Sequence, residues 1–95
     1  MSDDRDAARA PELVSEDELA RAAGVPRQVI VRLVRLGIIE PAAPATYPRA
    51  AARRVRRAFR LRRELAVGLA GVAVILDLLD RLERLEIELA RTRDG

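Results

Sequence analysis

The fold is decided by residues 14–37, which read VSEDELARAAGVPRQVIVRLVRLG. The side chain of Ser15 can accept a hydrogen bond from the first free amides of a helix, and Glu18 can return a bond to the backbone of Ser15. Val14, just outside this helix, can pack against Leu19 one turn inside it. Together these signals predict a helix that begins after Ser15.

A second helix should follow a tight turn at Gly24, where glycine can adopt the positive φ that ends the first helix at Ala23. Pro26 can be its first residue, since the missing amide has no partner at that position, and Gly37 can close it. Its apolar side chains share one stripe, made by Val29, Ile30, Leu33 and Leu36. Two short helices joined by a glycine turn predict a helix-turn-helix.

The segment after the helix-turn-helix predicts a very small β-wing and a third helix. Residues 38–40 can form a short strand that pairs with residues 45–47 across the Pro/Ala segment 41–44. The third helix should begin at Pro48 and reach about Val67. The residues expected to pack it on the helix-turn-helix are Val55, Ala58, Phe59 and Leu65.

A fourth helix should continue to about Arg93 after a break bracketed by Gly68 and Gly71. Alternating steps of three and four residues give it a seam of Ile75, Leu78, Leu82, Leu85 and Leu89. A second apolar strip, suited to docking on the same chain, consists of Val72, Leu76 and Leu79. The seam could bind a second copy of the chain or the helix of another protein, and we expect a homodimer because a bare seam would promote aggregation.

The composition excludes several classes of site. The 95 residues contain no Cys and no His, so thiolate nucleophiles, imidazole bases and the usual zinc sites are absent from the sequence. Glycine-rich phosphate loops and paired catalytic carboxylates are absent as well. We therefore expect a protein that is not an enzyme and that needs no metal and no cofactor.

Positive charge is concentrated in residues 49–63, which hold eight Arg and no acidic residue. On a helix this block could bind an anion, and DNA is one candidate. In that interpretation the helix-turn-helix enters the major groove, and the contacts come from Gln28, Arg32, Arg35, Arg49 and Arg53. Residues 41–47 carry no charge, however, whereas a wing that touches phosphates normally carries cations.

The ends of the chain complete the predicted organisation. Residues 1–12 are polar and aperiodic, so we expect a disordered arm, and they lack the apolar stretch of a secretory signal. No apolar run reaches membrane-spanning length, which predicts a cytoplasmic protein that does not enter a membrane. The winged-helix domain should span residues 13–67, and the dimerisation helix residues 68–95.

Two family resemblances follow from these motifs. Residues 13–41, with Glu18-Leu19-Ala20, Ala23-Gly24-Val25 and Leu36-Gly37-Ile38-Ile39-Glu40-Pro41, resemble the winged-helix segment of MerR-like proteins. Val25 stands where MerR regulators usually have a Ser or Thr cap, and residues 41–45 of the wing are Ala and Pro where those regulators have an Arg/Tyr-bearing wing. The predicted fold is therefore mainly all-α: a MerR-like winged helix-turn-helix with a minimal β-wing and a long C-terminal coiled-coil helix.

From Tyr47 to about Leu89 the chain is similar to chaperone modulators of the CbpM type. The most specific match is Arg60-Leu61-Arg62-Arg63-Glu64-Leu65-Ala66 followed by residues 71–82, which read GVAVILDLLDRL. One departure is Leu69-Ala70, where that family often has Trp-Pro. The resemblance implies a dimer that binds the J-domain of a DnaJ/CbpA-like co-chaperone and blocks its productive meeting with the DnaK chaperone.

The resemblance also suggests where the J-domain would bind. J-domains of this kind present a basic helix to DnaK, so an inhibitor that competes for this surface should offer acidic residues beside an apolar patch. The junction of the third and fourth helices offers both, with the candidates Glu64, Leu69, Val72, Leu76, Asp77 and Asp80. The alternative is a small MerR-like transcriptional regulator that binds DNA.

Overall fold

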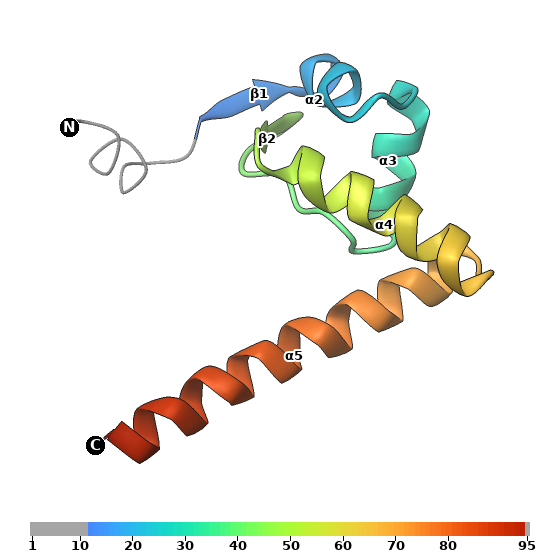
Figure 1. Ribbon diagram of the computed structural model, residues 1–95. Coiled ribbons are helices and arrows are strands. Elements are labelled where there is room, and N and C mark those ends of the chain that lie inside the picture. The colour runs from blue at the N-terminus through green and yellow to red at the C-terminus, as the bar shows by residue number, and fades with distance from the viewer. Residues whose placement is uncertain (1–11, 95) are drawn as a thin grey trace.

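The computed structural model describes residues 12–94 and contains four helices and one small sheet in this range. The elements are β1 (Leu13–Ser15), α2 (Glu16–Ala23), α3 (Arg27–Arg35), β2 (Thr46–Pro48), α4 (Ala51–Leu65) and α5 (Leu69–Asp94). Helices α2, α3 and α4 pack together with the sheet at one side of the domain, and α5 doubles back after α4 and then extends away from the domain (Figure 1). This arrangement confirms the mainly helical winged-helix fold with a long C-terminal helix.

The start and the end of α2 follow the local signals in the sequence. The amide of Glu18 donates to Oγ of Ser15 at 3.1 Å, and the amide of Ser15 donates to Oε1 of Glu18 at 2.8 Å, so the predicted capping box is present. Gly24 ends the helix with a φ of 74°. Gly37 ends α3 in the same way with a φ of 77°.

The predicted wing is wrong in its pairing. β2 pairs antiparallel with β1, with Val14 opposite Tyr47, and residues 38–40 form no strand. The amide of Ile38 is already used at the end of α3, where it donates to the carbonyl of Leu33 at 2.9 Å. Ile38 and the following Ile39 are both buried, whereas consecutive residues of a strand point to opposite faces.

The boundaries of the last two helices also differ from the predicted ones. α4 begins at Ala51 rather than at Pro48, because Pro48 lies in β2 and the amide of Arg49 donates to the carbonyl of Glu12. The break before α5 is made by residues 66–68, and Gly71 lies inside the helix. Leu65 is 48% exposed, so the prediction that it packs on the helix-turn-helix is wrong.

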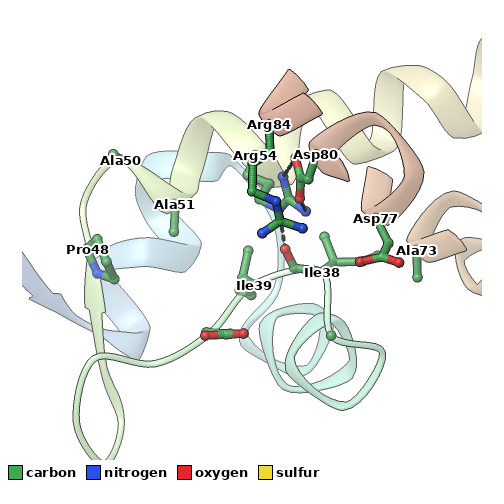
Figure 2. Close-up of a pocket in the computed structure, with 12 residues that line it drawn as sticks. Ile38, Ile39, Pro48, Ala50, Ala51, Arg54, Ala73, Asp77, Asp80 and Arg84 are labelled. Carbon is green, nitrogen blue, oxygen red and sulfur yellow. Dashed lines mark hydrogen bonds and ion pairs between the residues drawn. The ribbon is translucent and has the colours of Figure 1, made fainter. Parts of the chain in front are cut away.

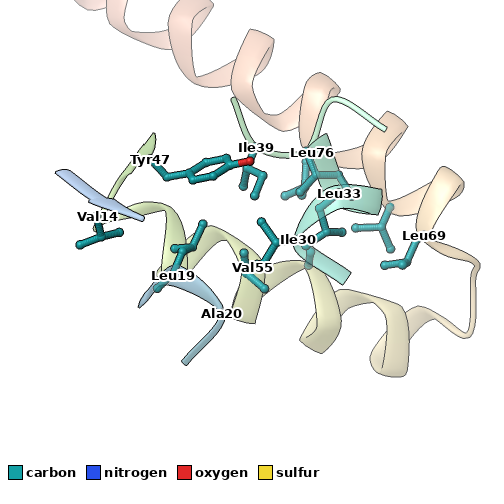
Figure 3. Close-up of a cluster of buried hydrophobic side chains, with 14 residues drawn as sticks. Val14, Leu19, Ala20, Ile30, Leu33, Ile39, Tyr47, Val55, Leu69 and Leu76 are labelled. Atoms are coloured by element: carbon teal, nitrogen blue, oxygen red, sulfur yellow. The ribbon is translucent and has the colours of Figure 1, made fainter. Parts of the chain in front are cut away.

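One hydrophobic core joins every element of the domain to the first turns of α5 (Figure 3). Val55 and Ala58 of α4 are buried in it and Phe59 is partly buried, as predicted. Val72 and Leu76 of α5 are fully buried, which confirms that these two residues of the predicted strip dock on the same chain, whereas Leu79 is only partly buried. The buried members are Val14, Leu19, Ala20, Ile30, Leu33, Ile38, Ile39, Tyr47, Ala52, Val55, Ala58, Leu69, Val72 and Leu76.

A polar network at the edge of the core connects α2, α3 and β2. The carboxylate of Glu16 accepts a hydrogen bond from Nε of Arg27 at 2.7 Å and another from the hydroxyl of Tyr47 at 3.0 Å. The bond from Arg27, opposed by partial burial and assisted by the bond from Tyr47, lowers the pKa of Glu16 below its ordinary value. Burial and the neighbouring Glu16 raise the pKa of Tyr47.

This network predicts a specific acid sensitivity. Because the pKa of Glu16 is depressed in the folded state, its contribution to stability is present above its ordinary pKa of 4.5 and is lost as the pH falls through the folded value. We therefore expect Glu16→Gln to make the fall in melting temperature from about pH 5 to about pH 3 shallower. Circular dichroism melts across this range test the prediction, with Glu83→Gln on the exposed part of α5 as the control. An unchanged acid slope in Glu16→Gln would contradict it.

Candidate functional site

The three apolar members of the predicted J-domain site are not on the surface. Leu69, Val72 and Leu76 are all buried in the core, where they attach α5 to the winged-helix domain (Figure 3). The prediction that they offer an apolar patch to a partner is therefore wrong in this conformation. The other prediction for Val72 and Leu76, that they dock on the same chain, is the one that agrees with their burial.

The acidic members of the predicted site are separated. Asp77 and Asp80 lie one turn apart on α5 and line the same groove, whereas Glu64 lies exposed near the end of α4 and does not line it. The opposite wall of this groove is the loop that follows α3, including Glu40. Sequence analysis missed Glu40 as a site residue because it predicted a strand there.

We call this surface the acidic groove and define it by the residues that line it in Figure 2. It has a volume of about 520 Å³ and is open to solvent. Small apolar side chains of α4 and α5, including Ala51 and Ala73, form part of its lining between the charged groups. The full lining is Gly37, Ile38, Ile39, Glu40, Pro48, Ala50, Ala51, Arg54, Ala73, Asp77, Asp80 and Arg84.

Arg54 connects the two walls of the acidic groove. Its guanidinium donates to both carboxylate oxygens of Asp80, at 2.8 and 3.3 Å, and its Nε donates to the carbonyl of Ile38 (Figure 2). This one side chain of α4 therefore holds the loop after α3, through Ile38, and the part of α5 that carries Asp80 in place. Because Asp80 is engaged in this way, its substitution would change the shape of the groove as well as its charge.

The remaining acidic residues of the groove are more available to a partner. Asp77 pairs with Arg81 one turn along α5, at 3.2 Å, but both side chains are more than half exposed. An exposed pair of this kind contributes little and is easily exchanged for another cation. Glu40 is exposed and forms no ion pair within residues 12–94. The groove thus presents two carboxylates, Glu40 and Asp77, to a cationic ligand, together with the exposed guanidinium of Arg84.

A second candidate surface is the apolar seam of α5. Leu78, Leu82, Leu85 and Leu89 are each more than half exposed, while Ile75, nearer the domain, is partly buried. From Arg81 to Asp94 every residue is exposed, so about 20 Å of helix projects beyond the domain. Within residues 12–94 nothing covers this seam.

The residues of the DNA interpretation lie in two places. Gln28, Arg32 and Arg35 are exposed on one face of α3, as a reading helix requires. Arg53 is exposed on α4, but Arg49 pairs with Glu12 at 3.5 Å. The uncharged segment 41–45 leads into β2 through a tight turn, closed by the bridge between Ala43 and Thr46, and it offers no cation to a phosphate backbone.

Comparison with protein families agrees with this architecture. The family model described as MerR HTH family regulatory protein matches residues 14–94, from β1 to the end of α5. The chain belongs to this MerR family. Comparison with curated proteins finds no match. Membership of the MerR family agrees with the helix-turn-helix and with the long helix α5 that follows it. It is compatible with either partner, a nucleic acid or a protein.

Two classes of feature are absent from the part of the chain that the structure describes. Its helices include none that is both long enough and apolar enough to span a lipid bilayer. Residues 12–94 also contain no cluster of three or more acidic side chains arranged to hold a metal ion. The candidate functional surfaces of this MerR-family chain are the acidic groove, the seam of α5 and the exposed face of α3.

Proposed function

We propose that this MerR-family protein is a chaperone modulator that binds the J-domain of a DnaJ/CbpA-like co-chaperone and inhibits its action with the DnaK chaperone. The proposal rests on the resemblance of residues 60–82 to modulators of the CbpM type. It makes the protein a cytoplasmic binding partner rather than an enzyme. Inhibition follows because a J-domain occupied on its basic helix cannot present that helix to DnaK.

The observation that supports this function best is the acidic groove. Glu40 and Asp77 face a basic ligand from two different elements, the loop after α3 and α5, and small apolar residues lie between them. A basic helix could place its cations against both carboxylates and an apolar residue against Ala51 and Ala73. The groove therefore replaces the buried apolar patch as the proposed contact.

Charge reversal in the groove tests the proposal. We expect Asp77→Arg and Glu40→Arg each to weaken binding to the J-domain at least about tenfold, since an attractive pair becomes a repulsive one. Isothermal titration calorimetry with the J-domain of the organism's own DnaJ-like protein measures this. The matched control is Glu83→Arg, which makes the same charge change on α5 outside the groove. An equal loss of affinity for the J-domain in the control, or no binding of the J-domain by the wild type, would contradict the proposal.

The alternative function is that of a DNA-binding transcriptional regulator, and the exposed Gln28, Arg32 and Arg35 favour it. The two functions predict opposite results from one pair of variants. Loss of Arg32 and Arg35 should weaken DNA binding and reduce its salt dependence, but should leave J-domain binding intact. Fluorescence anisotropy with a labelled duplex from the promoter of the protein's own gene, at several salt concentrations, separates the alternatives.

We also propose that the seam of α5 binds a second copy of the chain. The flanking charges support this occupant, because each side of the seam carries both signs and can pair across two identical helices: Arg81 and Glu88 lie on one side, and Glu86 and Arg93 on the other. The projecting part of α5 also has no other described element to cover its leucines. The dimer would leave the acidic groove free, since Asp77 and Asp80 lie on a different face of α5 from Leu78 and Leu82.

A further inference from the structure

A second groove, opposite in charge to the first, lies beside the turn of the helix-turn-helix. It has a volume of about 540 Å³ and is formed by that turn and the C-terminal half of α4. We call it the basic groove, and its lining consists of Ala23, Gly24, Val25, Arg56, Phe59, Arg60 and Arg63. It contains three Arg and no acidic residue.

The three Arg of the basic groove share one face of α4, since they follow one another at steps of four and three residues. Arg56 is partly satisfied, because its Nη1 donates to the carbonyl of Ala22 at 3.1 Å. Arg60 and Arg63 are exposed and have no ion pair within residues 12–94. These like charges repel one another, so a bound anion would relieve the repulsion.

The basic groove also has an apolar side. Phe59 and Val25 are partly buried, pack against the core and line the groove together with Ala23. A sugar-phosphate backbone would form ion pairs with the Arg side chains but would leave these apolar side chains without a contact. A polypeptide with carboxylates around an apolar side chain would satisfy both halves, because Arg pairs with carboxylates through two parallel hydrogen bonds.

We propose that the basic groove binds an acidic polypeptide segment, with its carboxylates on Arg60 and Arg63 and an apolar side chain against Phe59. This goes beyond the proposed J-domain contact, which concerns a basic ligand at the other groove. Arg54 and Arg56 point to nearly opposite sides of α4, at about 200° around the helix, so the two grooves can be occupied independently. The protein then has two sites of opposite charge preference.

A labelled peptide tests this inference on the full chain. The probe is a fluorescein-labelled octapeptide of Asp and Glu with one Leu and one Phe at its centre. Its neutral twin carries Asn and Gln in place of the acids. Fluorescence anisotropy at about 0.15 M salt measures binding, a concentration that screens long-range attraction beyond about 8 Å. We expect the acidic probe to bind and the neutral twin to bind at least about tenfold more weakly.

The variant Arg60→Ala/Arg63→Ala should weaken binding of the acidic probe at least about tenfold. Its control, Arg62→Ala/Arg91→Ala, removes the same net charge at two exposed positions outside the groove and should bind as the wild type does. Phe59→Leu, which keeps the site apolar and the core filled, tests the aromatic contact and should weaken binding severalfold. Both Arg of the first variant are exposed, so circular dichroism should show an unchanged fold.

Three outcomes would overturn the inference. Equal weakening in Arg62→Ala/Arg91→Ala would show attraction to net charge alone, without a site. Equal binding of the neutral twin would show that the Arg are not used. Displacement of the probe by a 20-base-pair duplex that binds more tightly, with the same dependence on Arg60 and Arg63, would assign the groove to nucleic acid instead.

Discussion

Replacement of both Leu82 and Leu85 by Glu is expected to convert the protein from a dimer to a monomer. These side chains are 53% and 60% exposed on the projecting part of α5, so the winged-helix core does not need them. In the proposed dimer each would be buried against the partner helix, and burial of a Leu side chain stabilises by about 1.5–3 kcal/mol. Four substituted sites per dimer, each now carrying a charge, should leave no measurable association at micromolar concentration.

Sedimentation velocity distinguishes this result from general destabilisation. The control is Ile87→Glu/Ala90→Glu, which adds the same two negative charges on the same stretch of α5 but outside the seam. The control should remain a dimer, and both variants should keep the helical circular dichroism spectrum of the winged-helix domain. A dimer that persists in Leu82→Glu/Leu85→Glu would place the interface elsewhere.

Leu76→Ala is expected to have the largest effect on folding. Leu76 is fully buried where α5 docks on the domain, and truncation of a buried Leu costs about 2–5 kcal/mol through lost burial and the cavity that remains. A domain of this size has a total stability of about 5–15 kcal/mol, so a large share should be lost. Urea denaturation at fixed protein concentration measures the change, which should lower the transition midpoint.

The matched control for this substitution is Ile87→Ala, because Ile87 is an aliphatic residue of the same helix that is 46% exposed. Its free energy of unfolding should change by less than about 0.5 kcal/mol, the usual range for surface positions. A change in Leu76→Ala as small as in the control would mean that the start of α5 is not part of the core. The domain would then end at the break at residues 66–68.

The parts of the fold that the sequence predicted depend on short-range signals. The capping box of Ser15 and Glu18 and the glycines at the ends of α2 and α3 act within a few residues, so their effects are visible in the sequence itself. The period of the apolar residues gave the helices and the projecting seam for the same reason. These signals were sufficient for the helix-turn-helix and for α5.

The pairing of the strands could not be obtained in this way. β1 and β2 are separated by α2 and α3, and no local pattern shows that residues 13–15 rather than 38–40 pair with β2. The deciding contacts are at Ile38, whose amide closes α3 and whose carbonyl accepts from Arg54. The first contact is local to the end of α3, whereas the second joins the loop to α4 and depends on tertiary structure.

The candidate site was predicted in part. Asp77 and Asp80 lie in one groove as expected. Val72 and Leu76 were predicted both to dock on the same chain and, with Leu69, to meet a partner, and their burial agrees only with the first prediction. Glu40 was missed because the loop after α3 approaches α5 only in the folded chain. The basic face of α4 was visible as a run of Arg, whereas its apolar side at Phe59 and Val25 was not.

The most direct test of the central claim is an NMR titration of the ¹⁵N-labelled protein with the unlabelled J-domain of its own co-chaperone. If the acidic groove is the contact, amide shifts should change at residues 37–40 and 73–80, on its two walls, and should be small along the exposed face of α3. In Asp77→Arg these changes should disappear while the rest of the spectrum is preserved. Changes confined to Gln28, Arg32 and Arg35, or no changes at all with the J-domain, would contradict the account.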